Sequence, residues 1–342
     1  MADRNAMRGI RPMNLKRVLL MTPMLFLGCS TQKENGHQME PPPAGQPTLF
    51  PRVELRLNEI AGEMIEVRRD LHRHPELSGQ ETRTEGVVVS RLRRLGLEVS
   101  PGVGGHGVMA RLTGGKPGGT VAIRADMDAV PSNDPDPVDF RSETPGVRHI
   151  CGHDIHTTVA LAVAEGLAAV QADLKGNVVF IFQPAEENVT GARAMLAAGA
   201  LDTWRPDVIF AFHTAPLEVG TIGTKPGILL GSRGTTADIA AGVPGTAPGV
   251  TNDADLESRT RDVIRSVVGT DNLFVLTSVT PGFSEDFGHF QARIPGVMYY
   301  LGVSNTPAGT AGMPHAADYV ADEASILVGA RVMSALVLNE LQ

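Results

Sequence analysis

The sequence predicts an α/β fold, in which helices cover the faces of a β-sheet. Short apolar segments of strand length alternate with segments whose apolar residues recur at helical spacing. Turns rich in glycine and proline separate many of these segments. Three strands are followed or ended by polar residues, at Asp126 and Asp128, at Glu186 and Glu187, and at His213. Open α/β sheets form their binding sites at such strand ends, so these polar residues mark a candidate site.

Two amphipathic helices come first in the predicted order of elements. The first runs from Leu57 to a stop at Pro75, and the second runs from Thr82 to Gly96. The elements after them are predicted as strands at 107–113 and 120–128, a helix at 156–171, a strand at 177–183, a helix at 190–201 and a strand at 207–213.

The alternation breaks between Thr224 and Asp255, where Gly, Ala, Pro and Thr dominate and little periodicity remains. This segment is predicted as a loop or linker. Regular elements resume after it, as a helix at 257–269, strands at 272–278 and 295–302, and a long closing helix at 322–341.

The composition is that of a soluble globular protein and argues against nucleic acid as the main partner. The 342 residues are 42% hydrophobic and 20% charged, and the net charge is −8. Phosphate binding needs clustered Lys and Arg, and no basic stripe is present. Aromatic residues make up only 4% of the chain, which is few for a surface that stacks on bases.

The first residues resemble an export signal. Basic residues precede the uncharged apolar run 18–29, "VLLMTPMLFLGC", which is too short to span a bilayer as a mature helix. Its end resembles the bacterial lipobox, with Cys29 as the lipidated residue; the alternative is an ordinary signal peptide with an incidental cysteine. Met13 is an alternative start to Met1. The expectation is a lipoprotein signal peptide at 1–29, a flexible Pro-rich tether at 30–52, and an exported chain that is lipid-anchored to a bacterial membrane and faces the periplasm or the cell exterior.

The stretch "HICGHDIHTT" concentrates metal-binding side chains within ten positions. Cys151 and His153 are two residues apart, so both can turn toward one point. Glu186 and Glu187 are neighbours in an extended segment, so one can bind a metal while the other stands beside the reacting water. Together with His213 and His315, these residues could complete two metal shells, and two nearby metals can activate a water and polarise a carbonyl together.

Seven sequence blocks, in order, resemble the di-metal aminoacylase and carboxypeptidase superfamily. The closest branch contains hippurate hydrolases, N-acyl-amino-acid amidohydrolases and the plant auxin-conjugate hydrolases. The blocks are "LHRHPELSGQET", "RADMDAVP", "HICGHDIHTT", "FQPAEENVTGARAML", "AFHTAPLEVGTIGTKPG", "GFSEDFGHF" and "PHAADYVADEASILVGA". The resemblance implies a three-layer catalytic domain with a mixed, mostly parallel sheet between helices. It also implies hydrolysis of an amide that joins an acyl group to an amino acid.

The resemblance also implies roles for individual residues. Cys151, His153, Glu187, His213 and His315 are similar to the family's metal ligands, with Cys151 as the bridge. Glu186 resembles the general base, which takes a proton from water and gives it to the leaving amine. The ligand types fit two divalent ions, with Zn, Mn, Ni and Co all remaining open.

Further polar residues in these blocks are expected to support the ligands without touching the metals. Asp154 is a candidate orienter of a ligand histidine, and His156 is a supporting or helix-capping residue. Asp126 and Asp128 are expected to support the metal loop. Glu285 is either a supporting carboxylate or a plain loop residue.

The chain departs from the family where a second, smaller α/β lid domain is usually inserted. The predicted catalytic domain occupies 53–227 and 253–342, and only the short segment 228–252 lies between its parts. The lid commonly mediates dimerisation, so a monomer is expected. Loss of the lid is also expected to impair or alter turnover and to uncover apolar surface.

The resulting hypothesis is an exported metal-dependent amidohydrolase acting on N-acyl amino acids or short peptides. Two alternatives stay open. One is a lidless aminopeptidase or dipeptidase, and the other is a catalytically impaired lipoprotein that still binds metal.

Overall fold

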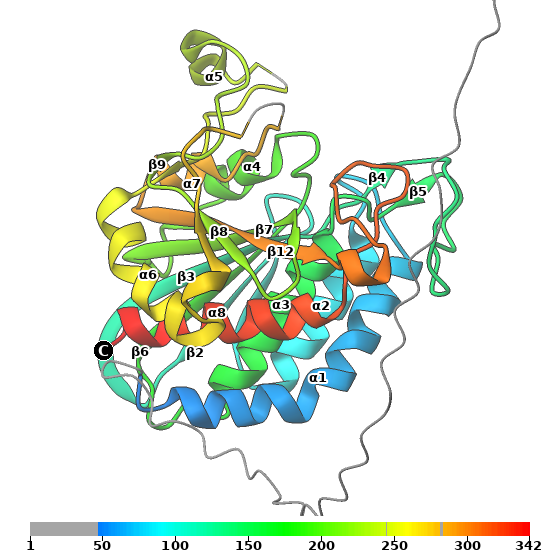
Figure 1. Ribbon diagram of the computed structural model, residues 1–342. Coiled ribbons are helices and arrows are strands. Elements are labelled where there is room, and N and C mark those ends of the chain that lie inside the picture. Colours follow the sequence, from blue (N-terminus) through cyan, green and yellow to red (C-terminus); the bar gives the residue numbers. More distant parts are fainter. Residues whose placement is uncertain (1–46, 244, 281–282) are drawn as a thin grey trace, which may run out of the picture. The chain divides into compact units, whose positions relative to one another are not determined.

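The structure is a computed structural model that describes residues 47–243, 245–280 and 283–342 (Figure 1). Its helices are α1 (Phe50–Arg73), α2 (Thr82–Arg94), α3 (His153–Ala168), α4 (Gly191–Ala197), α5 (Thr236–Ala241), α6 (Ala254–Val268), α7 (Gly288–Gln291) and α8 (Ala324–Glu340). Its strands are β1 (Glu98–Val103), β2 (Gly107–Thr113), β3 (Lys116–Asp126), β4 (Val130–Pro131), β5 (Val147–Arg148), β6 (Lys175–Gln183), β7 (Val208–Glu218), β8 (Ile222–Thr224), β9 (Gly227–Ile228), β10 (Thr251–Asn252), β11 (Leu273–Val275) and β12 (Gly296–Ser304).

Eight strands form one mixed sheet in the order β1-β2-β6-β3-β7-β12-β8-β11. The four central strands, β6, β3, β7 and β12, are parallel to one another. Antiparallel pairs join β1 to β2, β2 to β6, and β12 to β8. The predicted mixed, mostly parallel sheet is therefore confirmed, and the carboxyl ends of its central strands meet at one edge.

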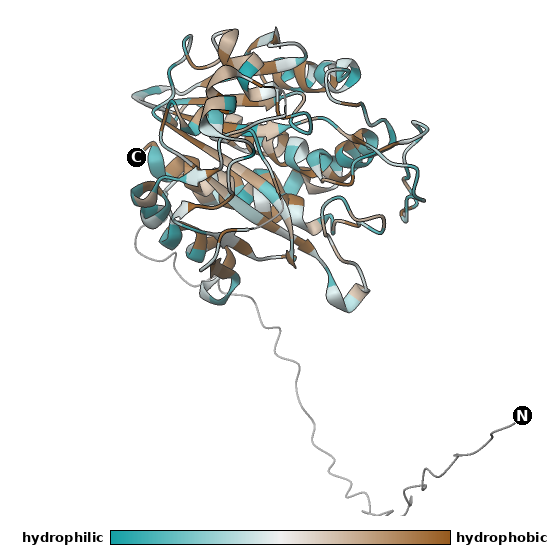
Figure 2. Ribbon diagram, turned by 90° about the horizontal axis from the view of Figure 1, so that it is seen from above, coloured by the Kyte–Doolittle hydropathy of each residue, from teal (hydrophilic) through white to brown (hydrophobic). Residues whose placement is uncertain are grey.

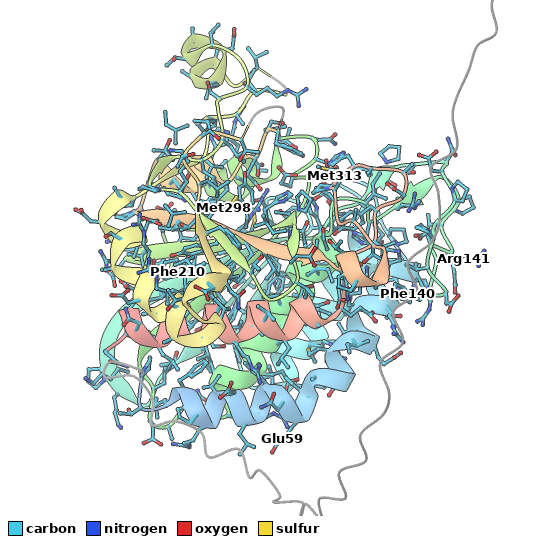
Figure 3. All side chains as sticks on the ribbon, in the orientation of Figure 1. Glu59, Phe140, Arg141, Phe210, Met298 and Met313 are labelled. Carbon is cyan, nitrogen blue, oxygen red and sulfur yellow. The ribbon has the colours of Figure 1, made fainter. Side chains whose placement is uncertain are left out.

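Helices cover both faces of this sheet, which gives the three layers expected. One face packs on α1, α2, α3, α6 and α8, and the other packs on α4 and α7. Neighbouring residues of β3 point to opposite cores, with Ile123 in the first and Ala122 in the second. Strands buried on both faces must be apolar throughout, which explains the continuous apolar runs in the sequence. The strands are mostly brown in Figure 2, and Phe210 and Met298, labelled in Figure 3, are buried in the sheet.

The first helix begins earlier than the sequence indicated, so the predicted tether boundary at residue 52 is wrong. Helix α1 starts at Phe50, with Pro51 in its first turn. Proline lacks the N–H that a first helical turn leaves unpaired, so it favours a helix start here. Phe50 and Val53 are both buried, which fixes this turn against the body of the protein.

The strand that carries His213 extends beyond it. Strand β7 continues to Glu218 because β12 pairs with it along its length, from Gly296 opposite Ile209 to Ser304 opposite Glu218. The sequence analysis placed His213 at the end of its strand, but the residue lies inside β7.

The bypass segment, residues 228–252, is not a structureless loop. It contains the short helix α5, whose N-cap residue Thr235 forms a reciprocal capping box with Asp238. Strands β9 and β10 pair at the two ends of this segment. In the described part of the chain no second α/β domain stands between β8 and α6, as expected from the sequence.

The proposed signal peptide, the lipidated Cys29 and most of the predicted tether lie outside the described residues. Among the residues that are described, no helix is both long enough and apolar enough to cross a membrane.

Candidate metal centre

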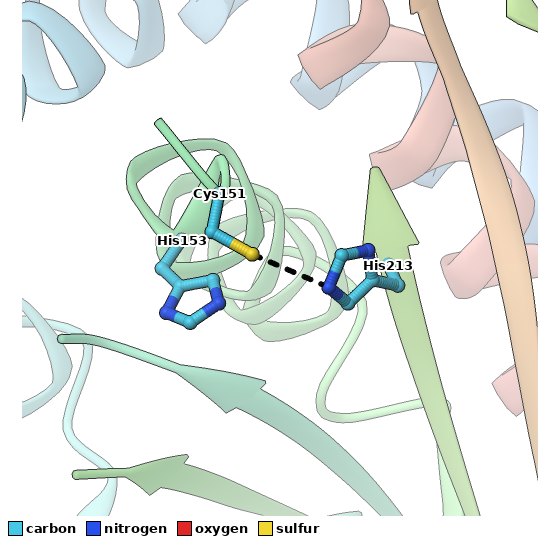
Figure 4. A group of neighbouring side chains, drawn as sticks. All are labelled: Cys151, His153 and His213. Atoms are coloured by element: carbon cyan, nitrogen blue, oxygen red, sulfur yellow. Dashed lines mark hydrogen bonds between the residues drawn. The ribbon is translucent and has the colours of Figure 1, made fainter. Parts of the chain in front are cut away.

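The five predicted metal ligands come from four places in the fold and lie together. His153 is the first residue of α3, and Cys151 lies just before this helix. His213 lies in β7, Glu187 follows β6, and His315 lies between β12 and α8. Figure 4 shows Cys151 and His153 at the start of α3 and His213 reaching toward them from its strand.

Cys151 belongs to two groups of converging donor atoms. One group is Cys151, His153 and His213, and the other is Cys151, Glu187 and His315. The Cys151 Sγ is 3.5 Å from His213 Nε2, and His315 Nε2 is 3.4 Å from a Glu187 carboxylate oxygen. A thiolate shared by two donor groups is placed as a bridge between two cations would be.

The donors have the chemistry and the free atoms that divalent metals require. Among the described residues, the buried His153 Nε2 and Glu187 Oε1 have no hydrogen-bond partner, although they lie only 3.7 Å apart. Buried polar atoms are normally hydrogen-bonded, so this pair calls for a ligand. Sulfur, imidazole and carboxylate donors suit Zn and similar ions. The residues present therefore fit two metals.

Two ligand histidines are oriented by hydrogen bonds from their other ring nitrogen. His153 Nδ1 donates to Asp128 Oδ1 at 3.2 Å, and His213 Nδ1 donates to the Thr214 carbonyl at 2.7 Å. Both bonds fix the tautomer in which Nε2 is free to bind a metal. Asp128 also accepts a bond from the Glu187 backbone N–H, so it ties together the loops that carry two ligands.

His156 supports the centre and does not have a free donor atom. Its Nδ1 donates to Asp126 at 2.5 Å, and its Nε2 accepts from the Thr214 N–H at 2.8 Å. Both ring nitrogens of His156 are therefore occupied. They connect Asp126 to Thr214, the neighbour of His213 in β7.

The prediction that Asp154 orients a ligand histidine is wrong. Asp154 accepts a hydrogen bond from His72 at 2.8 Å and pairs with the buried Arg68 at 2.8 Å. Successive residues of a helix point about 100° apart. His153 therefore faces the donors while Asp154 faces α1.

Glu186, the predicted base, is buried beside the ligands. Its carboxylate is 3.8 Å from His153 Nε2, and its side chain is grouped with Glu285 and Asp286. Burial, followed by the charges of Glu285 and Asp286, raises the pKa of Glu186 well above its ordinary value. Without cations these neighbours favour the protonated form of Glu186, and cations held by the adjoining donors would favour its carboxylate form.

Arg124 is the cation at the centre of this acidic group. Its guanidinium donates to Asp126 at 2.7 Å, to Glu285 at 2.8 and 3.1 Å, and to Asp286 at 3.3 Å, all of them buried. Glu285 also accepts from the Phe287 N–H, so both of its oxygens are engaged within this buried group. The sequence had drawn attention to Asp286 together with Glu285, as either a supporting or a plain loop carboxylate, but it did not single out Arg124. A charged residue inside the apolar run "TVAIRAD" was the available indication.

Burial and neighbouring charges also set the protonation of the ligands. Burial raises the pKa of the Cys151 thiol, and Glu187 adds to the effect. Burial lowers the pKa of His213 to about 3, which keeps the ring neutral. Burial opposes protonation of His153 too, but the charges of Asp126 and Asp128 outweigh it and raise its pKa to about 10. Cations placed among these groups would favour the thiolate and the neutral imidazole.

The backbone is strained around the same residues. Among the described residues, four non-glycine residues have positive φ, and three of them belong to the site: Ala185 at 52°, Val189 at 56° and His315 at 64°. Ala185 and Val189 flank the two glutamates. Each such conformation costs about 1–3 kcal/mol and persists where the surrounding structure enforces it, often at functional sites.

Two cavities adjoin the centre. A cavity of about 340 Å³ lies beside His213 and has mostly apolar walls that include Leu217, Leu230, Tyr300 and Met313. A second cavity of about 460 Å³ is lined by Glu186, Glu187, His315 and Arg233, among others. Phe283 and Ser284 line both cavities. Met313, labelled in Figure 3, and Phe283 are more than a third exposed, as expected for apolar surface that no lid covers.

This fold and donor set define an α/β protein with a two-metal centre of the kind that hydrolases use. The sequence pattern of the peptidase family M20/M25/M40 matches residues 122–339, which is more than half of the chain. The chain belongs to this family.

Known relatives agree with this assignment. The chain is 41% identical over 207 residues to an N-acyl-L-amino acid amidohydrolase of Geobacillus stearothermophilus, covering 59% of this chain and 55% of the relative. It is 44% identical over 172 residues to an N-acetylcysteine deacetylase of Bacillus subtilis, covering 49% of this chain and 44% of the relative. The chain spans about half the length of the curated relatives it matches.

A solved structure is similar as well. It is the YXEP protein of Bacillus subtilis, described as a dinuclear metal-binding peptidase of the M20 family. The match has a TM-score of 0.70 and 28% identity, and it covers 82% of this chain and 98% of that one.

Proposed function

We propose that this protein is an exported metal-dependent amidohydrolase that cleaves the amide bond of N-acyl amino acids. The observation that carries the proposal is the position of Cys151 in both donor groups, with the Glu186 carboxylate beside them. Two divalent cations held by Cys151, His153, Glu187, His213 and His315 would supply Lewis acidity, which polarises a carbonyl and acidifies water. Membership of the M20 family and the amidohydrolase relatives support the same reaction class.

Glu186 performs the proton transfers. Its carboxylate accepts a proton from the attacking water and then delivers it to the nitrogen of the leaving amine. Because Glu186 is only 4% exposed, bulk water does not compete for that proton. Burial, and after it the charges of Glu285 and Asp286, raise the pKa of Glu186, which strengthens it as a base, while the charges of bound cations would keep it ionised until it accepts the proton. Arg124 donates hydrogen bonds to both Glu285 and Asp286.

The cavity beside His213 favours an acyl group over a free amine. Its walls are mostly apolar, and Glu285 is the only carboxylate among the described residues that line it. Both oxygens of Glu285 already accept hydrogen bonds from Arg124. A charged α-ammonium group would find no free acid there, whereas an apolar acyl group would bury surface against Leu217 and Leu230.

The test combines metal analysis with a substrate panel on the full chain. N-acetyl amino acids, N-benzoyl amino acids and free-amine dipeptides are supplied to protein loaded with Zn, Mn, Ni or Co. We expect hydrolysis of the acylated compounds, a loss of roughly 10²–10⁴-fold in kcat for Glu186→Gln, and unchanged metal content by mass spectrometry. The matched control is Glu59→Gln, on the exposed face of α1 (Figure 3), which should change neither quantity.

The outcomes separate the alternatives. Hydrolysis of free-amine dipeptides alone would identify an aminopeptidase or dipeptidase, a candidate that the absence of a lid in the described residues favours. Two bound metals without hydrolysis of any substrate would identify a catalytically impaired metal-binding protein.

Export, lipid anchoring and a monomeric state belong to the same proposal. The pattern of basic residues, apolar run and Cys29 supports the first two. Fractionation of cells expressing the wild type and Cys29→Ser tests them, because only the wild type should remain with the membrane. Light scattering of the protein after removal of residues 1–29 tests the monomer.

A further inference from the structure

The bypass segment places one arginine in the wall of the metal-side cavity. Arg233 lines this cavity together with Glu186, Glu187 and His315, and it is the only lysine or arginine among the described residues that do so. The Glu187 carboxylate in the wall repels an anionic ligand, so a guanidinium there changes which ligands the cavity accepts.

The backbone of Arg233 is held firmly although its side chain is exposed. Its N–H donates to the Ala247 carbonyl at 2.9 Å, and the Ala247 N–H donates back at 3.0 Å. Leu230, three residues earlier, is buried and is bridged to Thr280. The arginine is therefore presented by a short paired segment that is anchored in the protein, which lowers the entropic cost of binding through it.

The guanidinium itself has little to bind within the protein. Among the described residues, its one side-chain hydrogen bond joins Nη1 to the Ser284 hydroxyl at 3.3 Å, and no carboxylate lies within ion-pair distance. The exposed Arg265 of this chain, by contrast, pairs with Asp262 at 2.8 Å. A guanidinium offers five N–H donors in a planar fork that matches a carboxylate, so most of its capacity stays available to a ligand.

The two cavities share walls, so together they can hold the two ends of one linear substrate. Phe283 and Ser284 line both, so a linear amide can extend from the apolar cavity past the donors into the cavity of Arg233. With the acyl group beside His213, the amino-acid part of the molecule reaches Arg233.

We propose that Arg233 binds the α-carboxylate of the substrate and so determines specificity for N-acyl amino acids with a free carboxyl group. This inference rests on the function proposed above. In this chain the short bypass segment, and not a lid domain, provides the anion-binding group.

The experiment compares two substrates that differ only in that charge. Benzoate release from N-benzoylglycine and from N-benzoylglycinamide is measured for the full metal-loaded chain and for Arg233→Ala, Arg233→Lys and Arg293→Ala. Arg293 is exposed and lines neither cavity, so its variant controls for the loss of a surface charge.

For Arg233→Ala we expect KM for N-benzoylglycine to rise roughly tenfold while kcat changes by less than about twofold. KM for the carboxamide should stay unchanged, and Arg233→Lys should recover part of the loss because it keeps the charge but not the fork. An equal effect on both substrates, no effect on either, or the same effect from Arg293→Ala would overturn the inference.

A binding measurement separates this inference from the proposed function. If the wild type hydrolyses neither compound, the proposed function fails for this acyl class, and calorimetric titration of the zinc-loaded chain decides the role of Arg233. Tighter binding of the carboxylate than of the carboxamide by the wild type, but not by Arg233→Ala, supports the inference. Equal affinities, or no binding of either compound, refute it.

Discussion

Replacing Arg124 by methionine tests how the acidic side of the site is held together. The guanidinium of Arg124 is fully buried and donates to Asp126, Glu285 and Asp286, and its Nε donates to Gln183 at 2.8 Å. Methionine fills much of the same volume but removes the only strong cation that contacts these three carboxylates in the described structure. The perturbation therefore removes charge with little change in packing.

The magnitude follows from the burial of the partners. Breaking a buried ion pair by removing one member costs about 3–5 kcal/mol, because the other member is left buried and uncompensated. A loss of 1 kcal/mol lowers Tm by about 2–4 °C in domains of 150–250 residues, so we expect Arg124→Met to unfold roughly 10 °C lower. Thermal and urea unfolding of the metal-free protein measure this directly.

The matched control is Arg265→Met on α6. Arg265 pairs with Asp262 at 2.8 Å, but the pair is exposed, with 38% and 91% of the two side chains accessible. Exposed helical pairs contribute about 0.3–0.5 kcal/mol, so this variant should unfold close to the wild type.

A small effect of Arg124→Met would refute the reasoning. If the variant loses less than about 1 kcal/mol, the three acids cannot depend on the cation for compensation. They would instead share protons in the folded protein. Burial does raise the pKa of Asp286 to about 8 despite the opposing charge of Arg124. The expected loss should accordingly be larger at pH 9 than at pH 6, where protonation can relieve the remaining repulsion.

Two further changes test the local geometry. Gly152 has a φ of 89°, and an added Cβ would lie 2.3 Å from the Tyr319 hydroxyl. Gly152→Ala should therefore destabilise the protein by more than about 1 kcal/mol and reduce its metal content. Unchanged metal stoichiometry by mass spectrometry would count against this. Asp136 accepts a hydrogen bond from His72 at 3.0 Å. Burial alone would raise the pKa of Asp136, but this hydrogen bond and the charge of His72 outweigh burial and lower the pKa to about 2. A carboxyl with a depressed pKa stabilises the fold above its unfolded value near 4 and loses that contribution as the pH falls toward 2. Asp136→Asn should therefore cost about 2 kcal/mol at pH 7 in urea unfolding and little at pH 2; an equal cost at both would contradict the assignment.

The sequence predicted the main elements because their patterns are strong. Strands such as β6 and β12 are buried along most of their length and contain continuous apolar runs, and α1 repeats its apolar residues at helical spacing. The edge strand β1 has no such pattern, because most of its residues are exposed and Pro101 lies within it. It was therefore missed. Helix α5 was missed for a similar reason: it buries no side chain, so its sequence has no apolar periodicity, and only the capping box marks its start.

The sequence was enough to predict the candidate ligands, but only some of the contacts that hold them in place. Cysteine, histidine and glutamate draw attention as residue types. The pairing of Arg124 with Glu285 joins positions about half the chain apart, which no local pattern reveals. Asp154 shows the opposite error: it is adjacent to His153 in sequence, yet the rotation of the helix turns it toward Arg68.

The scattered origin of the donors has a consequence for how the protein matures. Cys151 and His315 are nearly half the chain apart, and His213 lies between them on a central strand. The complete donor set comes together only in the folded chain, so binding of the ions would be coupled to folding. Once bound, the ions would crosslink the N-terminal and C-terminal parts of the chain. Resistance to unfolding would then depend on the free ion concentration around the protein.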